Sequence, residues 1–306
     1  KIHGLDTGLY TKTFIDIVYA VFAKYRQMWH ITYIMKNLAG IGKKSRSDLS
    51  MVLEQHAGPI TPKIVAETLN ISTQESGRLL SRWNKSGWMH RVKRGVYIPA
   101  SLSSTSITPV IEEPFLIADA IYGPGYIGGF SAVKHWDLSE QIIETVTYYT
   151  RKMVRIRHPT HGGVKFKLKT IAEHKHFGLK PIWIGSHKIY VSDPTKTIVD
   201  IFDDPKVVGG MAIVQDIFGE YFESEYYDFE LLVQYVHKIN NKSIFKRLGF
   251  LLDTCFPIGQ AELSLLRENI SEGYSIFDPS TTPKQTISKW RLKTSRSWKA
   301  LYDRKK

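Results

Sequence analysis

The sequence predicts an α+β protein with two folded domains: a small helical module that ends in a hairpin, and a larger domain in which short strands precede helices. Three observations support this prediction. At 306 residues the chain is long enough for two hydrophobic cores. Two capped helices and a basic hairpin follow one another over residues 61–98. Beyond them the apolar pattern changes from short strand-like runs to helical spacing.

Composition shifts divide the chain. The clearest boundary is the polar stretch Ser-Leu-Ser-Ser-Thr-Ser-Ile-Thr-Pro at 101–109, which is typical of a linker. We therefore expect five segments, namely an N-terminal extension of uncertain role (1–44), a helical module with a hairpin (45–100), the linker (101–109), an α+β C-terminal domain (110–293) and a basic tail (294–306).

The first helices of the module are marked by their ends. A helix over 46–56 is expected to stop at Gly58-Pro59. Thr61 followed by Pro62 predicts the next helix, because the hydroxyl can cap free amides and proline is tolerated at the first helical position. Asn70-Ile71 then forms a short turn.

The last helix of the module begins at Ser72, and Glu75 three residues later completes a capping box. Gly87 ends this helix, and residues 88–98 predict two short strands around Lys93-Arg94-Gly95. Two capped helices with a very short turn, followed by a basic hairpin, are typical of a winged helix-turn-helix.

One face of this helix has the chemistry of a DNA-reading surface. Leu79, Leu80 and Trp83 share the inward face. No Asp or Glu falls between Arg78 and Arg94, whereas a merely solvated helix usually mixes both charges. Gly77 would let the backbone approach a groove. The expected DNA contacts are Gln74, Arg78, Ser81, Arg82 and Lys85 on the helix and Arg91, Lys93 and Arg94 on the hairpin. The alternative is a soluble basic face on a small structural domain.

The larger domain is predicted to contain a small sheet followed by a helical region. Helices are expected near 113–122 and 131–136. Strands are expected at 145–150, 154–157, 164–168, 182–184 and 189–191. Asp193-Pro194 predicts a capped helix over 195–202, and helical patterns follow at 211–218, 228–239, 243–252 and 260–268.

The overall charge and the single cysteine narrow the class of protein. The formal net charge of +13 favours a polyanionic partner. Cys255 is the only cysteine, so no intrachain disulfide can form and a reducing cytoplasm is expected. The most apolar early stretch, 14–35, is interrupted by charged residues and predicts no membrane span.

Three constellations suggest other chemistry and have simpler explanations. Gly123, Gly125 and Gly128 match a dinucleotide-binding pattern, but the preceding run is helical, so a structural turn and no cofactor are expected. The spacing of His158, His161, His174 and His176 fits no zinc pattern, so no metal is expected. Asp193, Asp200, Asp203 and Asp204 could suggest a nuclease, but capping and turn roles explain the first and the last two; no catalytic residue is assigned.

The C-terminal stretch 284–306 holds nine basic residues and one acid, with Trp290 and Trp298 among them. Such a mixture can bind nucleic acid through charge and stacking. A frayed, solvated terminus explains it equally well.

Three stretches of the chain resemble the AbiEi-type antitoxins of bacterial abortive-infection systems. They are Tyr126-Ile-Gly-Gly-Phe-Ser-Ala-Val-Lys-His-Trp-Asp-Leu-Ser-Glu-Gln141, Ile189-Tyr-Val-Ser-Asp-Pro-Thr-Lys-Thr-Ile-Val-Asp200 with Gly209-Gly210 after it, and Gly87-Trp-Met-His-Arg-Val-Lys-Arg-Gly-Val-Tyr97. The resemblance covers about residues 45–293.

This resemblance implies an antitoxin of a type IV toxin–antitoxin pair that serves in phage defence. In that family the winged helix binds inverted repeats in double-stranded DNA at its own promoter and represses it. The C-terminal domain counters a nucleotidyltransferase-like toxin, without a stable toxin–antitoxin complex. The implied protein is a non-enzymatic, cytoplasmic autorepressor, either a monomer or a weak dimer. The alternatives are a DNA-targeted nuclease, a transcriptional regulator unrelated to a toxin, and a module whose winged helix binds a protein.

Overall fold

The computed structural model describes residues 40–56, 58–100, 113–185 and 187–305. The chain divides into two compact units, residues 1–111 and 112–306. The expected linker at 101–109 and most of the expected N-terminal extension, residues 1–39, lie outside the described residues.

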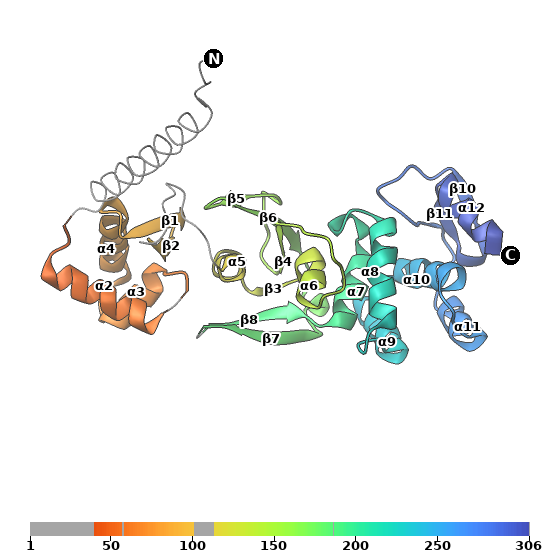
Figure 1. Cartoon of the computed structure of the whole chain (residues 1–306), viewed down its shortest axis with the longest axis horizontal. Coiled ribbons are helices and arrows are strands. Elements are labelled where there is room, and N and C mark those ends of the chain that lie inside the picture. Colours follow the sequence, from red (N-terminus) through yellow and green to blue (C-terminus); the bar gives the residue numbers. More distant parts are fainter. Residues whose placement is uncertain (1–39, 57, 101–112, 186, 306) are drawn as a thin grey trace, which may run out of the picture. The chain divides into compact units, whose positions relative to one another are not determined.

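Among the residues that the structure describes, the first unit has three helices followed by a two-stranded antiparallel hairpin (Figure 1). The helices are α2 (Lys43–Gln55), α3 (Pro62–Leu69) and α4 (Thr73–Lys85), and the strands are β1 (Met89–Lys93) and β2 (Val96–Pro99). A separate core holds this unit together. Its fully buried side chains include Val52, Val65, Leu80, Trp83 and Met89.

The predicted helix caps of this unit are present. The Thr61 hydroxyl accepts a hydrogen bond from the Ile64 amide (3.4 Å), and Pro62 is the first helical residue of α3. Asn70 ends α3 in the left-handed conformation (φ 50°), which gives the sharp turn into α4. These local signals set the boundaries of α3 and α4 close to where the sequence predicts them.

A six-stranded mixed sheet forms the first part of the second unit, in the order β5-β6-β4-β3-β8-β7. Its strands are β3 (Gly125–Ile127), β4 (Val146–Thr150), β5 (Thr160–His161), β6 (Val164–Thr170), β7 (Leu179–Ile184) and β8 (His187–Ser192). The central strand β4 pairs antiparallel with β3 and parallel with β6, and β7 forms one edge.

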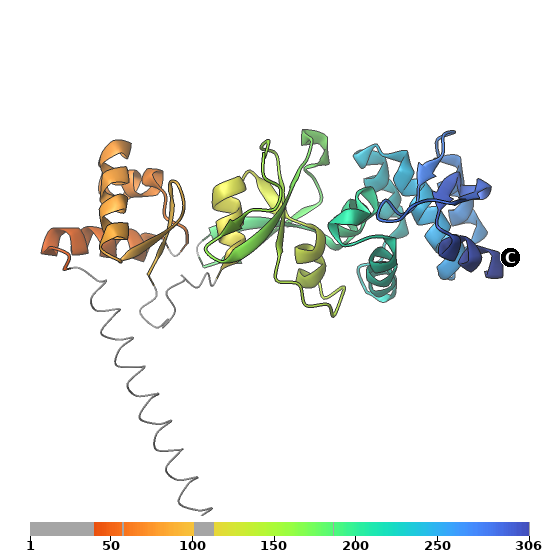
Figure 2. The ribbon, with the colours of Figure 1, turned by 90° about the horizontal axis from the view of Figure 1, so that it is seen from above.

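Helices cover both faces of this sheet. The helix α5 (Pro114–Tyr122) lies on one side, and α6 (Gly129–His135) and α7 (Pro194–Asp203) lie on the other (Figures 1 and 2). Neighbouring residues of β4 show the two faces: the Tyr148 hydroxyl donates to Asp119 of α5 (2.6 Å), whereas Tyr149 joins the core beneath α7. Burial on both faces explains why every residue of β4 is buried.

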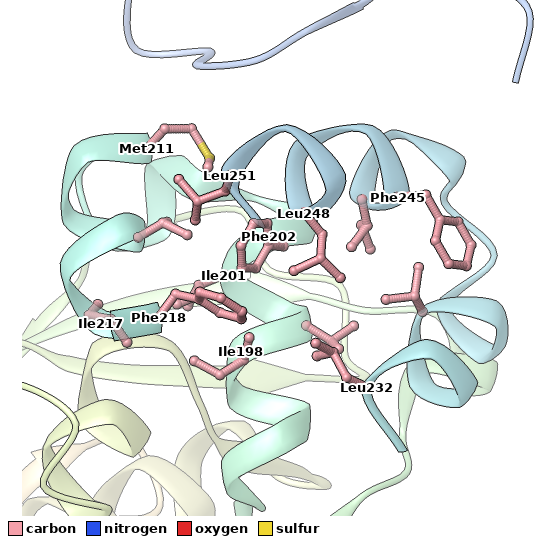
Figure 3. Packing of buried hydrophobic residues seen from close by; sticks show 14 of the residues in the cluster. Ile198, Ile201, Phe202, Met211, Ile217, Phe218, Leu232, Phe245, Leu248 and Leu251 are labelled. Carbon is pink, nitrogen blue, oxygen red and sulfur yellow. The ribbon is translucent and has the colours of Figure 1, made fainter. Parts of the chain in front are cut away.

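The helical region continues from α7 through α8 (Met211–Glu223), α9 (Phe229–Ile239), α10 (Lys242–Cys255) and α11 (Gln260–Glu268). Figure 3 shows side chains of α7, α8, α9 and α10 that point toward one another, with Phe202, Phe218, Leu232 and Leu248 among them. The short 3-10 turn Pro205–Val207 follows α7, so Asp203-Asp204-Pro205 ends that helix as predicted.

The C-terminal segment is folded, which corrects the predicted basic tail. A three-stranded sheet is formed by β9 (Ser275–Ile276), β10 (Gln285–Ile287) and β11 (Leu292–Thr294), and the helix α12 (Arg296–Lys305) follows it. Trp298 and Tyr302 of α12 pack into the main core, because an indole and a phenol every four residues make one face of this helix apolar. Trp290 is fully buried, so neither tryptophan is free to stack on nucleic acid.

Two further predictions about this unit are wrong in detail. Residues 154–157 form no strand; they run beside β6 as an irregular edge, where Pro159 has no amide hydrogen for a regular ladder. Residues 125–127, expected to be part of a turn, form the strand β3 inside the sheet. The α+β class is confirmed. None of the helices in the described part of the chain is long and apolar enough to cross a membrane.

Candidate nucleic-acid interface

The outer face of α4 brings together all five helix residues that the sequence singled out. Each of them is solvent-exposed, and Leu80 and Trp83 are buried on the opposite face. An open depression runs along this outer face, lined by Gln74, Gly77, Arg78, Ser81, Arg82 and Lys85. The helix therefore presents amide, hydroxyl and cationic side chains side by side to solvent.

A capping box starts α4 and thereby places this face. The Ser72 hydroxyl accepts from the Glu75 amide (3.2 Å), and the Glu75 carboxylate accepts from the Ser72 amide (3.0 Å) and hydroxyl (2.7 Å). These hydrogen bonds from Ser72, with a smaller contribution from Arg78, lower the pKa of Glu75. The one acidic group of the first turn is thus engaged in the cap, at the start of the helix.

Two polar contacts that the sequence analysis did not identify hold α4 against its neighbours. Ser76, fully buried, donates to the carbonyl oxygens of Pro62 (2.7 Å) and Thr73 (2.8 Å) and so ties α4 to the start of α3. The Trp83 indole nitrogen donates to the Ser45 hydroxyl of α2 (2.8 Å). A small polar residue within the apolar stripe of a helix was the available signal for Ser76.

The hairpin that follows α4 exposes the other three predicted residues, Arg91, Lys93 and Arg94. Gly95 makes the turn with a positive φ of 78°, where a residue with a side chain would be strained. The Arg91 amide donates to the Asn84 side-chain oxygen (2.9 Å), which fixes the hairpin to the end of α4. The hairpin is also held to the segment before α3, because Ile60 and Tyr97 of β2 exchange two backbone hydrogen bonds of 2.8 and 2.9 Å.

The electrostatic character of this surface follows from its sequence. Between Glu75 and Glu112 the chain contains no acidic residue, while Arg78, Arg82, Lys85, Arg91, Lys93 and Arg94 all point to solvent. Clustered cations attract phosphates. When such cations neutralise a polyanion, the counterions of the polyanion are released, and this release favours binding.

In the second unit, the glycines of the dinucleotide-like pattern serve packing. A β-carbon on Gly125 would lie 2.1 Å from the Tyr149 carbonyl oxygen, and one on Gly128 would lie 2.5 Å from the Tyr149 ring. These two glycines therefore allow β3 to lie close against β4. This explains their positions by the close approach of two strands.

The carboxylates that could have suggested a nuclease are engaged in structural contacts. Asp193 caps α7 as predicted, accepting from the Lys196 amide (2.6 Å), and also accepts from the Tyr235 hydroxyl (2.9 Å). Asp200 accepts from the Lys196 ammonium and from the Tyr126 hydroxyl (2.8 Å). Asp203 accepts from Lys175 and from the Asn241 side chain, both at 2.8 Å.

The histidines of the sheet do not converge. His161 hydrogen-bonds Tyr122 through its Nε2 atom (2.6 Å), and His176 packs its ring edge-on to Tyr126. Among the described residues no group of three or more His, Cys, Asp or Glu side chains is arranged to hold a metal ion.

Comparison of the chain with protein-family models and with curated proteins finds no match.

Proposed function

We propose that the first unit is a winged helix that binds double-stranded DNA, with α4 in the major groove and the β1–β2 hairpin as the wing. The observation that carries the proposal is the outer face of α4, which is acid-free beyond its cap and exposes Gln74, Arg78, Ser81, Arg82 and Lys85. The order of three helices and a hairpin, with an added bridge between Ile60 and Tyr97, supports it.

The side chains divide into two roles in this proposal. Gln74 and Arg78 have the donors and acceptors that pair with base edges, so they read sequence. Lys85, Arg91, Lys93 and Arg94 neutralise phosphates, which supplies affinity and orientation without sequence information. The protein represses its own promoter by occluding it, and an inverted repeat there engages two copies of the chain, whether a weak dimer or two monomers.

We further propose that the chain is a cytoplasmic, non-enzymatic antitoxin of a type IV system. This step depends on the resemblance of residues 87–97, 126–141 and 189–200 to the AbiEi-type antitoxins. The second unit counters a nucleotidyltransferase-like toxin without forming a stable complex with it. Co-expression with a toxin gene found next to this one tests the step: growth is rescued by the full chain and by an Arg78→Ala variant.

Fluorescence-anisotropy titration of the DNA upstream of the gene tests the DNA-binding part, with a scrambled duplex as control and several salt concentrations. We expect tight binding that prefers the native duplex and weakens as salt rises. Equal and weak binding to both duplexes contradicts sequence-specific repression. Magnesium-dependent cleavage of the duplex, lost in an Asp193→Ala or Asp200→Ala variant, favours a nuclease instead.

A further inference from the structure

The hairpin β7–β8 exposes an aromatic surface that the proposed function does not use. Trp183 is 66% exposed and Tyr190 is 36% exposed, and both lie on one face of the hairpin with Pro181 and Lys188. The strand register places Trp183 opposite Lys188 and Pro181 opposite Tyr190, so the four side chains project to the same side. We call these four residues the hairpin platform.

The platform ends where the helical layer begins. Further along the same face, the Ser192 carbonyl oxygen accepts a hydrogen bond from the Trp136 indole (2.7 Å). The Ser192 hydroxyl hydrogen-bonds the Thr197 hydroxyl of α7 (2.7 Å). Toward the tip of the hairpin, the helical layer no longer covers this face. Trp183 and Tyr190 therefore expose large ring surfaces to water. A ligand that covered these rings would bury that apolar area.

Backbone geometry argues against the addition of another strand at this edge. The Asp193 amide donates to the Gly178 carbonyl oxygen (2.8 Å), so alternation along the ladder points the backbone groups of residues 179, 181 and 183 away from β8. Pro181 stands in the middle of these outward positions and has no amide hydrogen. Proline at such a position blocks the pairing of an edge strand, so the side-chain face is the binding surface.

Charge identifies the kind of partner. The hairpin β7–β8 contains two lysines, Lys180 and Lys188, and no acidic residue. On the platform the Lys188 ammonium lies 5.4 Å from the centre of the Tyr190 ring, whereas Lys180, opposite Val191, lies on the other face of the hairpin. Aromatic rings beside cations fit nucleobases joined by phosphates, because the bases stack on the rings and the cations offset the charge.

We propose that the hairpin platform binds single-stranded nucleic acid, with unpaired bases stacked on Trp183 and Tyr190 and phosphates held by Lys188. Duplex DNA buries its base faces inside the helix, so it cannot use this platform. The site is therefore separate from the duplex-binding face of α4, and it stands whether or not the first unit binds DNA.

The test is fluorescence anisotropy of the full chain with a fluorescein-labelled ten-nucleotide oligouridine, and with oligothymidine as a second strand. Stacking on an aromatic ring contributes enough that its removal is expected to weaken binding about tenfold, so the Trp183→Ala, Tyr190→Ala double variant should bind at least tenfold more weakly. Trp183→Phe keeps a ring and should retain most of the affinity. Lys188→Gln should weaken binding and reduce its salt dependence.

Two controls separate this site from the first unit and from general effects. Tyr274→Ala removes an aromatic side chain that is 49% exposed on the β9 side of the same unit, and it should bind the single strand normally. Arg78→Ala with Lys85→Ala should lose the duplex but keep the single strand. The proposal is overturned if the platform variants, with unchanged circular dichroism, bind the single strand as the wild type does. It is also overturned if the Arg78 and Lys85 changes abolish single-strand binding.

Discussion

Lys196 occupies the most demanding position for a charged residue in the second unit. Its side chain is fully buried, and its ammonium donates to Asp200 one helical turn later and to the Tyr126 hydroxyl (2.9 Å). Burial lowers the pKa of Lys196, and the neighbouring Asp200 opposes that shift. The pair links α7 to the strand β3, because Tyr126 also donates to Asp200 (2.8 Å).

Removing this ammonium should destabilise the protein strongly. We expect Lys196→Met to lower the free energy of unfolding by about 3–5 kcal/mol, because Asp200 is left as an uncompensated buried charge. Urea denaturation measures the change. The matched control is Lys63→Met, which removes an i,i+4 partner of Glu67 whose two side chains are 82% and 65% exposed, and which should cost less than about 1 kcal/mol. A Lys196→Met protein as stable as the wild type would show that the pair contributes nothing.

Asp203 makes stability depend on pH. Burial alone would raise the pKa of Asp203, but Lys169, Asn241 and Lys175 outweigh it and lower the pKa below its ordinary value. A carboxyl whose folded pKa is depressed stabilises the protein above its unfolded pKa of about 3.9 and loses that contribution as the pH falls through its folded pKa. Asp203→Asn should therefore be less stable than the wild type at pH 7, and the difference should shrink toward pH 3. Urea midpoints across this range measure it, and a constant difference would contradict the prediction.

Gly77 has no packing reason to be glycine. A β-carbon at this position would meet nothing within 4 Å. Gly77→Ala should therefore stabilise α4 by about 0.5–1 kcal/mol, because alanine loses less backbone entropy in a helix. Under the proposed function the added methyl lies between the helix and the DNA, so affinity for the native duplex should fall severalfold. Increased stability with unchanged affinity would exclude a close approach of the backbone to the groove.

At the scale of elements, α4 and the β1–β2 hairpin carry two sets of exposed side chains to which the proposed function gives different roles. The Arg91 amide donates to the Asn84 side chain, and this contact between the hairpin and α4 involves neither Arg78 nor Lys93, so substituting either of those residues does not remove it. This allows the two roles to be separated by substitution.

Arg78→Ala and Lys93→Ala should differ in kind. Loss of Arg78, where it pairs with a guanine, should cost about 1–3 kcal/mol of binding free energy and relax sequence preference. Loss of Lys93 should weaken all duplexes similarly and reduce the salt slope by about one. Anisotropy titrations of the native and scrambled duplexes at several salt concentrations measure both. Lys299→Ala removes the same charge from the second unit and should leave the affinity for both duplexes unchanged. Identical behaviour of the Arg78→Ala and Lys93→Ala variants would refute the division of roles.

At the scale of the whole molecule, the described residues of the two units pack around separate hydrophobic cores. One lies among α2, α3, α4 and the first hairpin, and the other extends from the six-stranded sheet through α12. Separate cores predict separate unfolding transitions.

Core substitutions should therefore act on one transition each. Leu80→Ala and Leu248→Ala both truncate fully buried leucines, one in each core, and each should cost about 2–5 kcal/mol. Differential scanning calorimetry should show the first variant lowering the midpoint of one transition and the second variant lowering the other. A single transition that both variants shift equally would show that the two units unfold together.

Local chemistry in the sequence was sufficient for the first unit. Thr61, Pro62, Ser72 and Glu75 predict where α3 and α4 begin, because caps depend on residues within four positions of each other. The exposed face of α4 follows from helical periodicity alone. The sequence by itself therefore determined the α+β class, these helices and the solvent-facing side of α4.

Only the tertiary structure decided which residues meet across long separations. The pairing of β3 with β4 and β8, the contact of Tyr126 with Asp200 and the burial of Trp298 depend on packing between segments far apart in the chain, which periodicity does not encode. For the same reason, the sequence alone did not identify the hairpin platform. Alternation in β7 and β8 predicts which side chains share a face, but only the extent of the helical layer decides that Trp183 and Tyr190 remain in water.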